Sequence, residues 1–393
     1  MSTGRTALEG IRVLDVAQVM AGPFCAMQLC DMGADVIKVE PPDGDPTRQM
    51  GARGGSDSAG FAALNRGKRA IVLDLKSAAG RRAFERLAAG ADILIENFRP
   101  GVMQQLGLDY GTLSATNPRL IYASISGYGQ TGPDAAKGGF DLIAQGVSGV
   151  MSVTGAPGAA PVKSGVPLTD LGAGLFALAA ILAALHHRTR TGRGQHIDTS
   201  LLEAGLALSV WEAAEYFAEG VTPRALGSSH RFLAPYQAIR CSDGYITIGA
   251  GTDRLFAELC DLLGHRGWAA DASFASAASR VKNREALIER IEAITSTNTR
   301  AHWLAKLEAH RIPCGPINTY AEAFADPQVA AREMVVEIDH PTFGRMRTLG
   351  SPIKMSETPP VTGRRVPRLG EDTEAVLREI GLSDREIAEI CQP

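Results

Sequence analysis

Short β-rich runs alternate with helical patterns along the first half of the chain, and this alternation limits the fold more than any other feature. Five runs have strand character: 11–16, 35–40, 69–75, 91–98 and 119–129. Helical patterns at 23–33 and 78–90 lie between them. Strands separated by helices predict a largely parallel sheet with ligand sites at the carboxyl ends of its strands. We therefore predict an α/β fold.

The turn after the first strand does not carry the glycine pattern of a dinucleotide-binding site. The segment at 15–23 has the sequence DVAQVMAGP, where that pattern would be GxGxxG. The whole chain also lacks a GxSxG elbow, which excludes the usual serine-hydrolase arrangement. Neither a nicotinamide cofactor nor a nucleophilic serine is therefore indicated.

The pattern of predicted secondary structure changes near Thr222. Two short strands around a Ser-Asp-Gly turn are followed by a Gly-Ala-Gly loop and by helical segments as far as about Ala309. We predict a large domain over 1–223 and a smaller domain over 224–317. Residues 318–393 are expected to link the two and return to the large domain.

Charge and cysteine usage exclude several classes of protein. The formal charge of −3 argues against a general nucleic-acid binder. The six cysteines are scattered without CxxC or zinc-ligand spacing, which favours reduced thiols and no metal site. The longest apolar stretch, 175–185, is too short to span a membrane, and no signal peptide precedes the first strand. We expect a soluble, cytoplasmic protein.

Basic residues recur at or near the ends of the predicted strands. They are Lys38, Arg48, Lys68, Arg69, Arg99 and Lys137. On one rim of a parallel sheet they would form a basic surface suited to a phosphate-rich ligand. Ordinary solvated side chains are the alternative. The loop containing Gly249 and Gly251 also has two interpretations. It brings backbone N–H groups to a substrate, or it is a plain turn between a strand and a helix.

One carboxylate, Asp170, stands where a long apolar helix is expected to begin. Aspartate at that place commonly caps a helix by accepting unpaired backbone N–H groups. It can also act as a nucleophile. The residues alone therefore indicate an α/β enzyme for an anionic, phosphate-bearing ligand, with Asp170 as one candidate nucleophile.

An ordered set of motifs goes further. It comprises VLDVAQVMAGPFCAMQLCDMGADVIKVEPPDGDPTR, LNRGKRAIVLDL, ENFRPGVMQQLGLDY, NPRLIYASISGYGQTGP, GGFDLIAQGVSGVM and TGRGQHIDTSLLEA. From about Gly10 onward the chain closely resembles the class III (family III) CoA-transferases, whose fold α-methylacyl-CoA racemases share. The resemblance implies a Rossmann-like large domain built from both chain ends, a smaller inserted α+β domain, and an interlocked homodimer.

The resemblance also implies a reaction. Asp170 matches the catalytic aspartate of the family, and it would attack an acyl-CoA to give a mixed anhydride and then a β-aspartyl-CoA thioester. The substrates would be an acyl-CoA and a small carboxylic acid, with no permanently bound cofactor. We expect the N-terminus of the helix to hold Asp170 ionised. Backbone N–H groups at the helix start and at Gly249–Gly251 would stabilise oxyanions.

Further residues take their expected roles from the same resemblance. Asp141 matches an acidic residue close to the active site. The residues that match CoA contacts are Val19 (through its backbone), Lys38, Lys68, Asn97, Phe98, Arg99 and Lys137.

Departures from the family's patterns indicate the subgroup. Phe140 stands where racemases carry a histidine base, and one base cannot readily exchange protons on both sides of an α-carbon. Met20 replaces the glutamine of formyl-CoA transferases. The chain looks most like the succinyl-CoA:glutarate type, which suggests a dicarboxylate acceptor and succinyl-CoA as donor. An acyl-CoA isomerase of the racemase type is the alternative.

Overall fold

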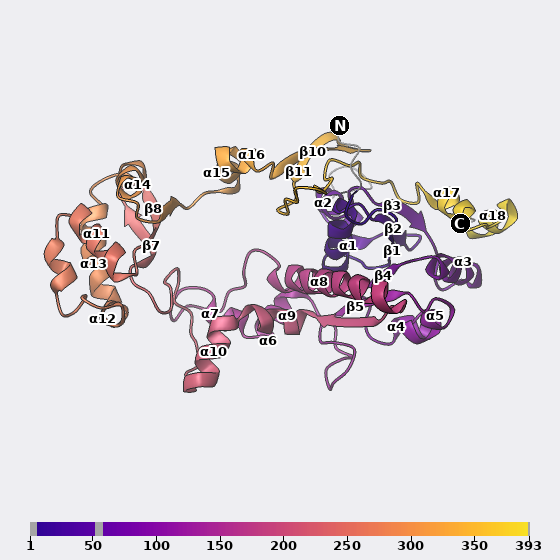
Figure 1. Ribbon diagram of the computed structural model, residues 1–393, viewed down its shortest axis with the longest axis horizontal. Helices are drawn as coiled ribbons and strands as arrows, with labels where there is room; N and C mark the ends of the chain where they lie inside the picture. Colours follow the sequence, from indigo (N-terminus) through magenta and orange to yellow (C-terminus); the bar gives the residue numbers. More distant parts are fainter. Residues whose placement is uncertain (1–5, 52–57, 392–393) are drawn as a thin grey trace. The chain divides into compact units, whose positions relative to one another are not determined.

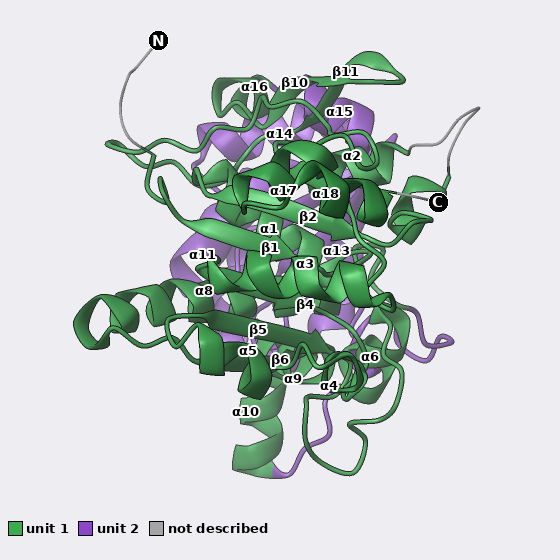
Figure 2. Cartoon of the chain, turned by 90° about the vertical axis from the view of Figure 1, so that its right-hand side faces the viewer, with its two compact units in different colours: residues 1–150, 163–219, 327–393 green, residues 151–162, 220–326 purple. Residues whose placement is uncertain are grey.

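The computed structural model describes residues 6–51 and 58–391. The chain divides into two compact units, coloured separately in Figure 2. The first comprises 1–150, 163–219 and 327–393, and the second comprises 151–162 and 220–326. The range 224–317 expected from the sequence lies within the second unit.

Among the described residues, six parallel strands form the central sheet of the first unit. They are β1 (Arg12–Asp15), β2 (Asp35–Glu40), β3 (Arg69–Val72), β4 (Ile93–Glu96), β5 (Ile121–Ser126) and β6 (His196–Ser200). Their order is β3-β2-β1-β4-β5-β6, which is the Rossmann order. The predicted parallel α/β fold is confirmed, with β6 as a strand that the sequence patterns did not reveal.

Both faces of this sheet are buried under helices (Figure 1). On one face, α1 (Ala21–Asp31), α8 (Leu168–Thr191) and α9 (Leu201–Leu208) pack against β-strand side chains such as Ile95 and Ile125. The opposite face is covered by helices from early and late in the chain, namely α3 (Ala78–Ala89), α5 (Tyr110–Thr116), α17 (Thr373–Glu379) and α18 (Asp384–Cys391). Burial on two faces explains the nearly continuous apolar runs of the strands.

Shorter elements complete the first unit. They are the 3-10 helix η1 (Pro46–Arg48), α2 (Ala59–Asn65), α4 (Val102–Leu106), α6 (Asp141–Val147), α10 (Val210–Glu219), α16 (Pro327–Ala331), β10 (Val335–His340) and β11 (Gly344–Leu349); the short helix α7 (Val150–Val153) lies where the two units join in sequence. The extended segment after β11 returns to the start of the chain: the Val361 amide donates to the Asp31 carbonyl, and the Asp372 carboxylate accepts from the Ala70 amide. Both chain ends thus contribute to this unit.

The second unit has its own core. An antiparallel sheet joins β7 (Tyr236–Cys241), β8 (Gly244–Gly249) and β9 (Cys314–Pro316). Its helical elements are α11 (Asp253–Leu262), η2 (Arg266–Ala270), α12 (Ala277–Lys282), α13 (Arg284–Thr295), α14 (Arg300–Ala309) and α15 (Tyr320–Ala325). The fully buried Arg280 guanidinium donates to the carbonyls of Ala234, Phe274 and Gly251.

Helix α8 is longer than the apolar run that the sequence suggested. By length and composition it could cross a membrane, but Ala173, Ala177 and Ile181 are fully buried in the core beside α1. At Gly174 an added Cβ would lie 2.7 Å from the Ala21 carbonyl oxygen and 3.1 Å from the Phe24 ring. Glycine therefore sets the close approach of α8 to the start of α1.

Replacing Gly174 with valine should lower the free energy of unfolding by about 2 kcal/mol or more, because the new side chain overpacks against a backbone carbonyl. Urea denaturation measures this loss. Ala183→Val, which adds the same branched side chain on an exposed part of α8, is the matched control. Equal stability of the two variants would contradict the assigned packing.

Candidate functional site

The site lies at the point where the order of the parallel strands reverses. Strand β1 is flanked by β2 and β4, so the chain leaves the carboxyl ends of β1 and β4 toward opposite faces of the sheet. A cavity of about 340 Å³ opens there, within the first unit. It is lined by Gln18, Val19, Met20, Ala21, Asn97, Phe98, Arg99, Pro100, Ile125, Ser126, Gly127, Lys137, Gly138, Gly139, Phe140, Asp170 and Leu201.

Most of the predicted site residues meet at this cavity. From the turn after β1 come Val19 and Met20, and from the turn after β4 come Asn97, Phe98 and Arg99; Lys137, Phe140 and Asp170 complete the set. Segments far apart in sequence converge because parallel strands deliver their carboxyl ends to one edge.

Asp170 does not cap α8, so the capping expectation is wrong. The helix begins at Leu168, and Asp170 is its third residue, with Pro167 at the capping position. Asp141, the first residue of α6, takes over the capping function from outside the helix. Its Oδ1 accepts hydrogen bonds from the Thr169 amide at 3.0 Å and from the Thr169 hydroxyl at 2.8 Å.

A chain of hydrogen bonds extends this support. Asp141 Oδ2 accepts from the side-chain amide of Gln145 at 2.7 Å, and Gln145 Oε1 accepts from the Ser164 amide at 2.9 Å. The start of α6 thereby holds both the start of α8 and the loop that leads into it. Thr169 is fully buried and was not identified from the sequence.

The electrostatic surroundings of Asp170 differ from those expected. Burial, and second the nearby Asp141 carboxylate, raise the pKa of Asp170 to about 6. The expected stabilisation of its charge by the helix N-terminus does not prevail. The carboxylate form still predominates at neutral pH, because the pKa remains below 7.

Asn97 ties the two turns at the cavity together. Its side-chain oxygen accepts a hydrogen bond from the backbone N–H of Gln18, and its side-chain nitrogen donates one to the backbone carbonyl of Gln18, both at 2.7 Å. The next residue, Val19, has a φ of +67°. In the Rossmann fold this first turn usually contains glycines, and here a valine adopts the left-handed backbone conformation.

The predicted basic rim is wrong for Lys38 and Lys68. The Lys38 ammonium is buried against Asp45 at 2.7 Å, and the Lys68 ammonium is buried against Asp15 at 2.7 Å. The cavity lining, drawn from the described residues, includes neither lysine. Sequence position located Lys38 on β2 and Lys68 directly before β3, but it did not reveal their acidic partners.

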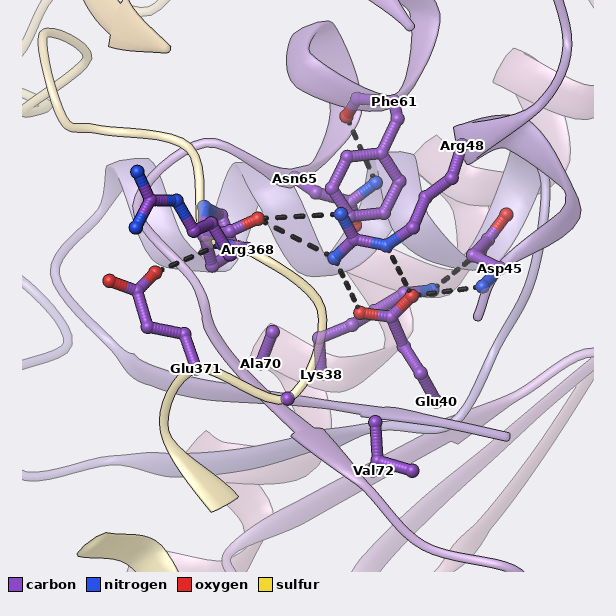
Figure 3. A network of polar contacts seen from close by, with 12 residues as sticks. Lys38, Glu40, Asp45, Arg48, Phe61, Asn65, Ala70, Val72, Arg368 and Glu371 are labelled. Atoms are coloured by element: carbon purple, nitrogen blue, oxygen red, sulfur yellow. Dashed lines mark hydrogen bonds and ion pairs between the residues drawn. The ribbon is translucent and has the colours of Figure 1, made fainter. Parts of the chain in front are cut away.

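Two further arginines are also engaged away from the cavity. Arg48 is buried and bonded to both carboxylate oxygens of Glu40 (Figure 3). Arg69 begins β3 and pairs with Asp35 and Glu379. Of the predicted basic residues, Arg99 and Lys137 are the ones that line the cavity.

The glycine loop belongs to the second unit. A Cβ on Gly251 would lie 2.6 Å from that of Leu233, and the Gly251 carbonyl accepts from Arg280 at 2.8 Å. The Gly249 amide donates to the Pro313 carbonyl at 2.8 Å. Close packing within this unit thus accounts for glycine at 251.

A second, polar cavity of about 320 Å³ adjoins the first through Arg99 and Pro100. Among its lining residues, Ser124 Oγ lies 3.0 Å from His196 Nε2, and the Tyr110 ring stacks on the His196 ring. Burial raises the pKa of Glu96 to about 7, and its carboxylate accepts from the Phe98 amide at 2.8 Å. This cavity was not predicted from the sequence. The one feature that could have indicated it is the position of Glu96 directly before Asn97.

Comparison with known proteins agrees with this geometry. The model of CoA-transferase family III matches residues 8–373. A succinate–glutarate CoA-transferase of Agrobacterium fabrum is 41% identical over 98% of this chain and 98% of its own. A succinyl-CoA:mesaconate CoA-transferase of Haloarcula hispanica is also 41% identical, over 96% and 97% of the two chains.

A solved structure shares the fold. The crystal structure of a CaiB/BaiF family protein from Brucella suis is 43% identical and superposes with a TM-score of 0.85, covering 95% of this chain and 99% of that one. The family model matches nearly the whole length of the chain, and the cavity lies at the strand switch. The chain therefore belongs to CoA-transferase family III.

Proposed function

We propose that this enzyme transfers CoA from an acyl-CoA to a carboxylic acid, with Asp170 as the nucleophile. The observation that carries the proposal is the position of Asp170 in the wall of the cavity that Asn97, Phe98 and Arg99 also line. A carboxylate that is partly desolvated yet ionised at neutral pH is suited to attack a thioester.

The reaction proceeds through two kinds of covalent intermediate, a mixed anhydride and a thioester. An oxygen of Asp170 attacks the thioester carbonyl, the C–S bond breaks, and CoA thiolate leaves a mixed anhydride behind. The thiolate then attacks the Asp170 carbonyl and releases the donor as a carboxylate, which yields the β-aspartyl-CoA thioester. The acceptor carboxylate repeats these steps in reverse, so no water or nucleotide is consumed.

The first unit supplies the contacts to CoA in this proposal. Arg99 and the exposed Lys137 are the cations of the cavity and would bind its phosphates. Asn97, Phe98 and the Val19 backbone would border the rest of the ligand. The Gly249 N–H, expected from the sequence to stabilise an oxyanion, instead donates to the Pro313 carbonyl within its own unit.

We propose a dicarboxylate as acceptor and succinyl-CoA as donor. The relatives named for succinate, glutarate and mesaconate support this choice. Phe140 lines the cavity and carries no ionisable group, which speaks against the isomerase alternative. The Met20 side chain likewise has no amide group that could form a hydrogen bond to a small acyl group.

A homodimer, interlocked as in the family resemblance, fits the surface of the first unit. Large apolar side chains are exposed on α6, α8, α9 and α10, where α9 packs against the other three. They include Leu142, Ile143, Val147, Leu175, Phe176, Leu206, Leu208, Val210, Trp211 and Phe217. A surface of this kind marks an interface. We place the dimer in the cytoplasm, where the six free cysteines stay reduced.

Mixing the protein with succinyl-CoA and quenching early should reveal a CoA-sized adduct by intact-protein mass spectrometry. Hydroxylamine should remove it, because it cleaves thioesters. Asp170→Ala should form no adduct and lose at least about a thousandfold in kcat, whereas the exposed Asp43→Ala control should behave as wild type. An adduct on the Asp170→Ala variant would refute the assigned nucleophile.

The pH profile tests the electrostatics of the site. Because attack needs the carboxylate, kcat/KM should fall as the pH drops through about 6. Asp141→Asn removes the neighbouring charge that raises the Asp170 pKa, and its amide oxygen can still accept from Thr169. The acidic limb should therefore move to lower pH. An unmoved limb, with unchanged stability, would exclude this coupling.

A further inference from the structure

Val19 is held in a conformation that its own side chain disfavours. A β-branched residue at a φ of +67° is strained, and such strain persists where surrounding contacts determine the backbone. Val19 also lines the cavity, one residue before Met20. The contacts that hold this peptide therefore shape the wall of the proposed acyl-CoA site.

A buried ion pair supplies those contacts. The Val19 amide donates to Asp45 Oδ2 at 3.4 Å, and the same oxygen accepts from Lys38 Nζ at 2.7 Å. Lys38 Nζ also donates to the Ala17 carbonyl at 2.5 Å. The pair thus binds the turn at Ala17 and at Val19, the residues on either side of Gln18. Each of its two side chains is only 1% exposed.

Asp45 is itself rigidly placed. Its other oxygen, Oδ1, accepts from the Thr47 amide at 2.9 Å and from the Thr47 hydroxyl at 2.6 Å. Its amide donates to Glu40 at 2.9 Å, and Arg48 holds that carboxylate from the other side (Figure 3). The Arg48 guanidinium stacks on Phe61 at 3.7 Å from the ring centroid. The ion pair is therefore part of a fixed frame.

We infer that Lys38 and Asp45 are positioning residues that set the Val19 backbone for acyl-CoA binding, without touching the ligand themselves. As to the identity of the ligand, the inference rests on the proposed function. Since Asp170 stands on a different helix, losing the pair should weaken CoA binding more than it slows the chemical step.

The main test replaces the pair by Lys38→Met with Asp45→Asn, which leaves no unpaired buried charge. We expect the Kd for CoA and the KM for succinyl-CoA to rise by about tenfold or more, with kcat changed by less than about threefold. The matched control is Arg66→Met with Asp31→Asn, an equally buried ion pair outside the cavity lining, which should leave both constants unchanged. Lys38→Met alone is the second variant: it keeps the three hydrogen bonds that Asp45 accepts but leaves its buried charge unpaired, so we expect a larger loss of stability than in the double variant.

A double-mutant cycle with Val19→Gly separates positioning from general stability. Glycine adopts positive φ without strain, so loss of the ion pair should affect the Kd for CoA less in the Val19→Gly background. Crystal structures of the variants would show whether residue 19 leaves the left-handed region when valine loses the pair. An unchanged Kd with Val19 still at positive φ, or an equal loss in the Arg66/Asp31 control, would overturn the inference.

Two of these readouts, the Kd for CoA and the φ of residue 19, need no turnover. A wild-type protein that binds CoA but reacts with no thioester would refute the proposed function alone. Normal transfer activity, with no effect of the pair on the Kd or on φ, would refute the positioning role alone.

Discussion

Two buried ion pairs beneath the β1–α1 turn determine the shape of the site. Lys38 on β2 and Lys68, directly before β3, reach the turn through Asp45 and Asp15, and Asp15 also accepts a hydrogen bond from the Ala17 amide. Removing one member of such a pair leaves an uncompensated charge, which costs about 3–5 kcal/mol. This turn therefore has little freedom to relax, and it forms part of the wall of the cavity at the strand switch.

The proposed nucleophile depends on a different support. Asp170 sits in the first turn of α8, and Asp141 from α6 binds the residue directly before it. Partial burial of the carboxylate in the cavity wall raises its pKa, so its placement opposes its ionisation. With a pKa of about 6, the group remains a carboxylate at neutral pH while it sheds part of its hydration.

Several elements could be predicted because their signal is local. Strands β1 to β5 are buried on both faces and read as apolar runs, whereas β6 has the polar sequence HIDTS and gave no such signal. The capping expectation for Asp170 failed by position, since the helix begins two residues earlier. Lys38 and Lys68 were placed on a ligand surface because residue type and strand position do not reveal what faces a side chain.

The sequence by itself determined the alternating α/β pattern, the family resemblance and the choice of Asp170, since these depend on order and spacing along the chain. Only the tertiary structure decided that Arg99 and Lys137 face the cavity while Lys38 and Lys68 are buried. It also decided that Asp141 caps α8 and that Val19 is held at positive φ. The physical reason is that charge pairing and capping depend on distances between segments, which parallel strands bring together from far apart in sequence.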